Sequence, residues 1–129
     1  MNYTLADFLI RIKNAYLANK KQVELPYSKY VESIGQILAQ EGYIKNITKN
    51  VIDAKPSLTA ELLYRARIAA LGDIKIVSKP SVHKYISKNQ VKKTLHEYGM
   101  SIISTSQGLM TNKTAATKNL GGELICKIS

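Results

Sequence analysis

Acidic residues are scarce in this chain. Nine aspartates and glutamates stand against nineteen lysines and arginines in 129 residues, which leaves a formal net charge of +10 and a pI of about 9.7. Such an excess favours a polyanionic partner, because bound cations displace the counterions condensed on a phosphate backbone. A nucleic acid is therefore the leading inference. An anionic membrane surface is a weaker alternative, since no basic amphipathic helix stands out.

Cysteine and long hydrophobic runs are also nearly absent. The single cysteine, Cys126, cannot form an internal disulfide, which fits a reducing compartment, and its apolar neighbours predict a buried structural thiol. No apolar run approaches the ~20 residues of a membrane span. The first residues lack the basic start and apolar core of a signal peptide. We therefore expect a protein of the cytoplasm or of an organelle interior, without a membrane partner.

The short motifs of common catalytic and cofactor sites are missing as well. There is no Walker loop, dinucleotide fingerprint, zinc-ligand spacing or G-x-S-x-G elbow. His83 and His96 have no CxxC or HxxxH partner. A Ser-His-Asp set could be drawn from Ser104, His83 and Asp73, but nothing in the sequence places the three together. We expect a non-catalytic protein without metal or cofactor, and keep a small enzyme as the third alternative.

Hydrophobic periodicity predicts an α+β fold in two halves. The N-terminal half, residues 1–67, shows the pattern helix, strand, helix, strand, strand, although residues 58–67 could equally be helical by composition. The C-terminal half, residues 68–129, shows mostly antiparallel strands with short helices that begin after Ser87 and Thr111. Each half alone would have a marginal core at roughly sixty residues. We therefore expect the halves to pack against each other.

The predicted elements of the two halves follow from this pattern. They are helices over 4–16 and 29–41 with strands over 23–26, 43–52 and 58–67 and a turn over 53–56 between the last two. Strands over 74–79, 82–86 and 100–104, helices over 88–98 and 112–119, and a last strand from residue 122 follow.

The stretch from Tyr98 to Ile128 combines hydroxyl side chains and glycines with almost no acid. A short apolar run is followed directly by Ser104, Thr105 and Ser106, and then by Gly108. Hydroxyl and backbone N–H groups suit phosphate and sugar oxygens, and glycine allows close approach of a ligand to the backbone. A Ser/Thr-rich turn before a capped helix explains the same pattern equally well.

Basic residues gather just before this stretch. Residues 74–96 hold six lysines and no acid. Lysine acts on phosphates as a point charge, so backbone binding is expected to outweigh direct base readout. Within this run, Lys79, Ser81, Lys84 and Tyr85 lie close together in sequence, and a tyrosine among lysines can stack on a base. A tyrosine in such a pattern is more often part of a core.

The first predicted helix offers a second basic surface. Arg11, Lys13 and Asn14 fall largely off its apolar stripe. They are secondary candidates for contacts with RNA phosphates, although a merely solvated helix face explains the pattern more simply.

Several segments together resemble a known family. The run Gly99-x-x-Ile102-Ile103-Ser104-Thr105-Ser106-x-Gly108-Leu109-Met110-Thr111 is similar to the signature of small ribosomal subunit protein eight in its bacterial form. Further similar segments, in chain order, are 7–15 (DFLIRIKNA), 38–44 (LAQEGYI), 77–80 (VSKP) and 120–126 (LGGELIC). The resemblance covers nearly the whole chain.

This resemblance implies a two-part α+β protein that binds a helical region in the central domain of small-subunit ribosomal RNA and acts early in subunit assembly. The implied partners are that RNA, neighbouring small-subunit ribosomal proteins and the messenger RNA of its own operon. A free-standing regulatory RNA-binding protein that uses the same surface is the alternative. By resemblance, the RNA contacts map to the hydroxyl turn, to Tyr85, and to a glycine-acid corner formed by Gly121, Gly122 and Glu123.

Two departures from the family pattern concern the site. Ser81 stands where the family usually has glycine after the proline, which leaves the conformation of this turn open. Asn112 and Lys113 stand where Asp-Arg is common, which shifts the local charge toward positive. Both departures suit a divergent bacterial lineage or an organelle.

The lysine-rich segment generates a first prediction. Each phosphate that the protein neutralises should add about −0.9 to the slope of log affinity against log salt on a duplex. Binding of RNA should therefore weaken by orders of magnitude from low to moderate salt. Titrations at four or more salt concentrations measure this slope, and an affinity that barely responds to salt contradicts the prediction.

Overall fold

The protein is described by a computed structural model that covers residues 3–78 and 82–129. Helices and antiparallel strands alternate along it, which confirms the predicted α+β class. The contacts within the chain divide it between Gly72 and Asp73 into two units, and the first residues of the chain are counted with the C-terminal unit. In the described residues, no helix has the length and hydrophobicity that a membrane span requires.

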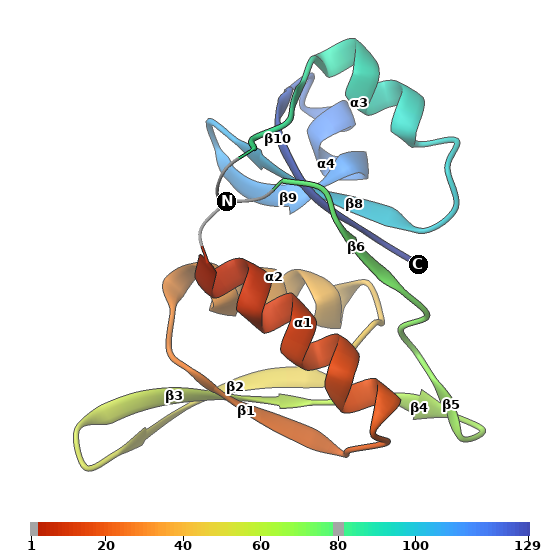
Figure 1. The fold of residues 1–129 in the computed structure, drawn as a ribbon. Helices are drawn as coiled ribbons and strands as arrows, with labels where there is room; N and C mark the ends of the chain where they lie inside the picture. Colours follow the sequence, from red (N-terminus) through yellow and green to blue (C-terminus); the bar gives the residue numbers. More distant parts are fainter. Residues whose placement is uncertain (1–2, 79–81) are drawn as a thin grey trace. The chain divides into compact units, whose positions relative to one another are not determined.

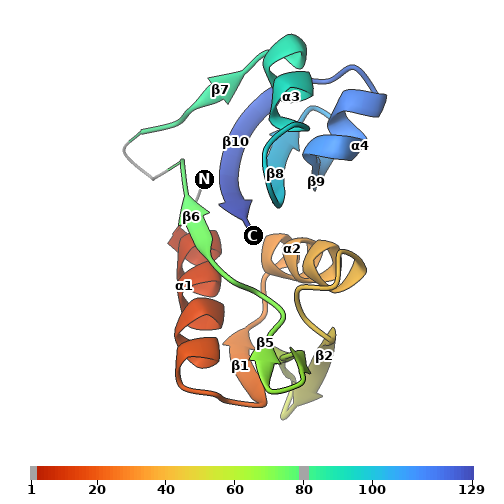
Figure 2. The same ribbon diagram turned by 90° about the vertical axis from the view of Figure 1, so that its right-hand side faces the viewer.

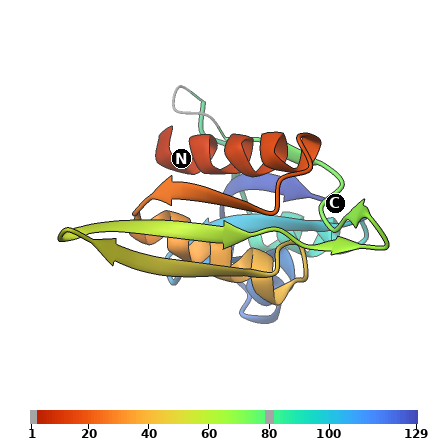
Figure 3. The same cartoon turned by 90° about the horizontal axis from the view of Figure 1, so that it is seen from below.

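The N-terminal unit is a small sheet covered on one face by two helices (Figure 1). The strand order is β1-β3-β2, and both pairs are antiparallel. Figure 3 shows the sheet with the helices behind it. The elements are α1 (Tyr3–Leu17), β1 (Gln22–Pro26), α2 (Lys29–Gln40), β2 (Asn46–Ile52) and β3 (Lys55–Glu61).

The helices form where the apolar spacing predicts them. The buried side chains of α1 recur every three or four residues, so they line one face of the helix. They are Leu5, Phe8, Leu9, Ile12 and Tyr16. Helix α2 ends at Gln40, and Gly42, just after the C-cap Glu41, has the left-handed φ of 82° that is typical of a helix stop. The Tyr43 N–H then donates to the Leu38 carbonyl at 2.9 Å, as the glycine stop requires.

Two hairpins in this unit differ from the prediction. Asp53 and Ala54 both have positive φ and turn β2 directly into β3, so β3 begins at Lys55 inside the predicted turn. The predicted strand over 58–67 ends at Glu61. A separate hairpin follows, formed by β4 (Tyr64–Arg65) and β5 (Ile68–Ala69), and its turn also has two residues with positive φ. This second turn contains no glycine and was not predicted, whereas Asp53 and Ala54 fall within the turn predicted over 53–56.

The C-terminal unit is built around its last strand (Figure 2). Strand β10 pairs with β6, β7 and β8, and β9 pairs with β8. The elements are β6 (Ile74–Ile76), β7 (Tyr85–Ile86), α3 (Lys88–Thr94), β8 (Met100–Thr105), β9 (Gly108–Thr111), α4 (Asn112–Thr117) and β10 (Gly122–Ile128). Strand β9 was not predicted, because its four residues follow the hydroxyl stretch that resembled a turn.

Both predicted helix caps of this unit are confirmed. The Ser87 hydroxyl accepts from the Gln90 N–H, and the Gln90 side chain accepts in return from the Ser87 N–H. The Thr111 hydroxyl accepts from the Thr114 N–H at 3.2 Å. The caps direct α3 and α4 onto the same face of the sheet. There a core forms from Val91, Ile103, Met110, Ala115 and Leu124.

The buried cysteine generates a second prediction. Cys126 is 0% exposed, and burial raises the pKa of its thiol to about 12, so the thiol stays protonated at neutral pH. Cys126→Ser places a hydroxyl in this site and should lower the free energy of unfolding by about 1–3 kcal/mol if the hydroxyl stays unpaired. Urea unfolding followed by tyrosine fluorescence measures the loss.

RNA binding by the folded fraction of this variant should equal that of the parent. A stable Cys126→Ser protein that has lost RNA binding would instead place the thiol in the binding site.

Candidate nucleic-acid interface

Three of the predicted site residues form a row across neighbouring strands. Glu123 on β10 lies opposite Tyr85 on β7 and opposite Ser104 on β8. These residues are far apart in sequence, and the pairing of β10 with two strands brings them together. Directly opposed residues in an antiparallel sheet project from the same face. Tyr85, Glu123 and Ser104 therefore share one face of the sheet.

This face is the one that the two short helices leave uncovered. Ile103 and Leu124 belong to the core beneath α3 and α4. Side chains alternate between faces along a strand, so their neighbours Ser104 and Glu123 point to the opposite face. Tyr85 is 71% exposed on this face, so it is not the core tyrosine that its sequence pattern also allowed.

The three hydroxyls of the predicted turn have separate positions. Ser104 belongs to the row, and Ser106 is exposed in the two-residue turn between β8 and β9. The Thr105 hydroxyl is engaged inside the hairpin, where it donates to the Gly108 carbonyl at 3.0 Å and accepts from the Gln107 N–H at 3.1 Å. Ser104 and Ser106 are thus the hydroxyls that can meet a ligand, while Thr105 holds the turn.

The two glycines before Glu123 allow its strand to lie close to its neighbours. A Cβ on Gly122 would collide with the Ser104 carbonyl oxygen, and a Cβ on Gly121 would come within 2.6 Å of the Ile86 carbonyl oxygen. Any larger residue would push β10 away from β8 or β7. The glycine pair therefore sets the spacing of the row. Gly108 differs, because its φ of 107° demands glycine while a Cβ there would meet open space.

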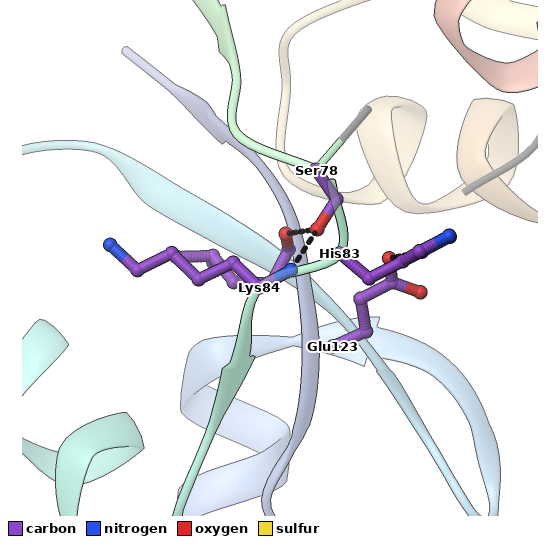
Figure 4. Close-up of polar contacts among 5 residues, drawn as sticks. Ser78, His83, Lys84 and Glu123 are labelled. Carbon is purple, nitrogen blue, oxygen red and sulfur yellow. Dashed lines mark hydrogen bonds and ion pairs between the residues drawn. The ribbon is translucent and has the colours of Figure 1, made fainter. Parts of the chain in front are cut away.

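Glu123 is held by a histidine. His83 Nδ1 lies 2.7 Å from Glu123 Oε2, and the glutamate side chain is only 13% exposed (Figure 4). Burial by itself would raise the pKa of Glu123, but hydrogen bonds, with that of His83 first among them, outweigh it and lower the pKa. The carboxylate is therefore ionised at neutral pH and accepts the Nδ1 proton. Carboxylate oxygens can accept from ribose hydroxyls or base amino groups.

Lys84 lies in the same segment but extends to the other side. Its side chain is exposed and points away from the His83–Glu123 pair (Figure 4). Its backbone carbonyl accepts from the Leu124 N–H at 2.8 Å, which fixes the segment on β10. Lys79 and Ser81, the other two predicted residues of this run, lie outside the described residues.

The secondary candidates belong to the N-terminal unit. Arg11 and Asn14 line one open groove, and Arg11 Nε also pairs with Asp7 at 2.9 Å. Lys13 is exposed on a different side of the helix. The groove is completed by Ala15, Ala18, Lys20, Gln22, Val23 and Glu24. Two of the three residues thus gather in one place, and their role as RNA contacts stays a prediction.

Sequence reasoning missed two residues of this region. Ser78 is fully buried and His83 pairs with Glu123, although neither was predicted as a site residue. The alternation of the predicted strand puts Ser78 on the face of Ile74 and Ile76, but serine is mostly an exposed residue type, so it was not taken as buried. The histidine lay within the basic run, but its partner is forty residues away. Within the described part of the chain, no cluster of three metal-ligating side chains occurs.

Comparisons with known proteins give matches over nearly the whole chain. The family model of ribosomal protein S8 matches residues 3–129. The small ribosomal subunit protein uS8 of Nitrosomonas europaea is 39% identical over 129 residues, which is 100% of this chain and 98% of that protein. The uS8 of Alcanivorax borkumensis is 40% identical with the same coverage, and that of Clostridium novyi is 38% identical over 99% of this chain and 98% of that protein.

The hydroxyls on the open face generate a third prediction. Ser104→Ala combined with Ser106→Ala removes two hydrogen-bonding groups and no charge. RNA affinity should fall by roughly 1–3 kcal/mol, while the salt slope should stay as in the parent. Lys84→Ala should instead lower the slope by about one phosphate contact. Titrations at several salt concentrations separate the two effects.

The matched control is Thr117→Ala, which removes an exposed hydroxyl bonded to a helix carbonyl of the same unit. If the folded double variant binds like this control and the parent, Ser104 and Ser106 only form a turn.

Proposed function

Because the chain belongs to the ribosomal protein S8 family, we propose that it binds the central domain of small-subunit ribosomal RNA directly and supports assembly of that domain. The family is one of ribosomal proteins, which confirms the expectation of a structural, non-enzymatic protein. Its named relatives are components of the small ribosomal subunit, so the chain is a ribosomal component. We further propose that it works in the cytoplasm, among neighbouring small-subunit proteins.

One observation carries the proposal of direct RNA binding. Tyr85, Glu123 and Ser104 stand side by side on the face of the sheet that α3 and α4 leave uncovered. This row combines a stacking group, an acceptor and a hydroxyl. Structured RNA is recognised through such groups, because its ribose hydroxyls and splayed bases need both donors and acceptors.

The charges around the row fit a structured RNA rather than an arbitrary polyanion. Lys84, whose side chain extends away from the His83–Glu123 pair, can neutralise a phosphate, whereas the ionised Glu123 repels one. A phosphate backbone can therefore approach on the lysine side, and ribose or base edges are favoured at the glutamate. This arrangement supports recognition of one RNA shape. The regulatory alternative, in which the protein binds its own messenger RNA, would use the same face.

Tyr85 generates the fourth prediction. Tyr85→Ala should weaken binding to a transcript of the central domain by about 1–3 kcal/mol, the usual range for a base stacked on an aromatic ring. Filter binding at fixed salt measures the change. Tyr98→Ala is the matched control, because Tyr98 is 93% exposed in the same unit and lies outside the row. Equal affinities of the two variants would show that Tyr85 does not contribute to RNA binding.

Two further measurements test the function as a whole. The protein should sediment with small subunits, and chemical footprinting should show protection of a helical region in the central domain. Protection that appears only on the messenger RNA of its own operon, without sedimentation, would favour the regulatory alternative.

A further inference from the structure

A buried hydroxyl connects the segment of Lys84 and Tyr85 to the central strand. Ser78 is 0% exposed, and its Oγ donates to the Leu124 carbonyl at 2.6 Å. The same Oγ accepts from the Lys84 N–H at 3.1 Å (Figure 4). The Leu124 N–H donates in turn to the Lys84 carbonyl at 2.8 Å. Lys84, Leu124 and Ser78 thus form a closed ring of three hydrogen bonds.

This ring replaces part of the regular strand ladder. Because Tyr85 lies opposite Glu123, Lys84 lies opposite Leu124 in the same register. A hydrogen-bonded antiparallel pair normally exchanges two direct bonds between its N–H and carbonyl groups. Here only one of them is direct, and the second passes through the Ser78 hydroxyl. The hydroxyl therefore holds the Lys84 backbone away from the Leu124 carbonyl.

The position of Ser78 is itself fixed by the backbone. The N–H groups of Val77 and Ser78 both donate to the Ile125 carbonyl, at 3.0 and 3.2 Å. The hydroxyl is thus a rigid spacer anchored on β10. Next to it, His83 and Glu123 form a second link between the same two segments.

We infer that Ser78 is a positioning residue for RNA binding, whose hydroxyl sets the place of Lys84 and Tyr85 relative to Glu123 and Ser104. This inference rests on the proposed function of the row. Ser78 is buried and touches no ligand itself. Removing its hydroxyl takes this partner from the partly buried Lys84 N–H and from the buried Leu124 carbonyl. The segment can pair them again only if Lys84 moves toward Leu124, which shifts Tyr85 out of the row.

The test uses Ser78→Ala in the full chain. Affinity for a transcript of the central domain of small-subunit ribosomal RNA should fall about tenfold, by the usual scale of hydrogen-bond losses. The salt slope should move toward that of Lys84→Ala. Amide hydrogen exchange at Lys84 should be faster than in the parent, because its N–H has lost its acceptor.

The matched control is Ser101→Ala. Ser101 is a serine of β8 that is 3% exposed, and its substitution removes the same atom from a buried strand of the same unit. It should bind RNA like the parent and leave exchange at Lys84 unchanged. If Ser78→Ala does not fold, Ser78→Cys is used, because the thiol keeps the size of the side chain but bonds weakly.

A double-variant cycle separates positioning from general destabilisation. In a protein that already carries Lys84→Ala and Tyr85→Ala, the Ser78 substitution should have little further effect on affinity, because it acts through these two residues. A full, additive loss in that background would overturn the inference, and so would parental affinity of the single variant. A loss equal to that of Ser101→Ala would do the same.

The exchange measurement needs no RNA and separates the two proposals. If the parent protein fails to bind the transcript, the proposed function falls. Faster exchange at Lys84 would still support the spacer role of the hydroxyl, and unchanged exchange would overturn it.

Discussion

The pairing of strand β10 with three partners is the constraint on which the C-terminal unit depends. A strand in this position must lie within hydrogen-bonding distance of β7 and β8 along the same few residues. Gly121 and Gly122 make this possible, since a Cβ at either would meet the backbone of a neighbouring strand. Glu123 follows the glycines directly. The close approach that builds the sheet therefore also determines which side chains stand next to each other on its open face.

Because side chains alternate along each strand, the two faces of this sheet carry different kinds of residues. Ile103 and Leu124 join the helices α3 and α4 in a core, while Ser104 and Glu123 face the other way. The core fixes the register, because a slip by one residue would exchange the two faces and take Ile103 and Leu124 out of the core. The geometry of the candidate interface is thus a consequence of the packing beneath it. The residues of the interface need contribute little to stability.

Local patterns predicted most elements of the fold, and pairing explains the rest. The apolar stripe of α1 and the caps at Ser87 and Thr111 are signals within a few residues, so the sequence contains them in full. The hairpin turn at 66–67 lacks glycine and was missed, because its positive φ values depend on the strands that it joins. The turn at 53–54 was predicted, but it is shorter than expected. Strand β9 was missed because Gly108 suggested a turn and not a strand start.

In the candidate site, too, local patterns indicate residue types while strand pairing determines their arrangement. Tyr85, Ser104 and Glu123 were expected from hydroxyl content, charge and family resemblance, yet their arrangement in a row follows from strand register, which no local pattern contains. The opposite holds for Thr105, whose hydroxyl type suggested a contact but whose bonds are used within the hairpin. Residue types indicate what a site can bind. Which of them remain available depends on bonds between distant segments.

The positive and negative charges of this surface have different roles toward a nucleic acid. Lysines dominate the net charge of +10, and their attraction for phosphate is long-ranged and insensitive to sequence. Glu123 opposes that attraction at short range. Its repulsion of a phosphate is offset only where the partner donates hydrogen bonds to the carboxylate. Within the protein, Glu123 Oε2 lies 2.7 Å from His83 Nδ1, and the pKa of the glutamate is lowered, so the carboxylate is ionised at neutral pH. In the RNA complex that we propose, the lysines would attract the phosphate backbone and Glu123 would turn it away from the row. In the proposed complex, the same two charge types that govern affinity would also orient the RNA, with its sugar and base edges toward Ser104 and Tyr85.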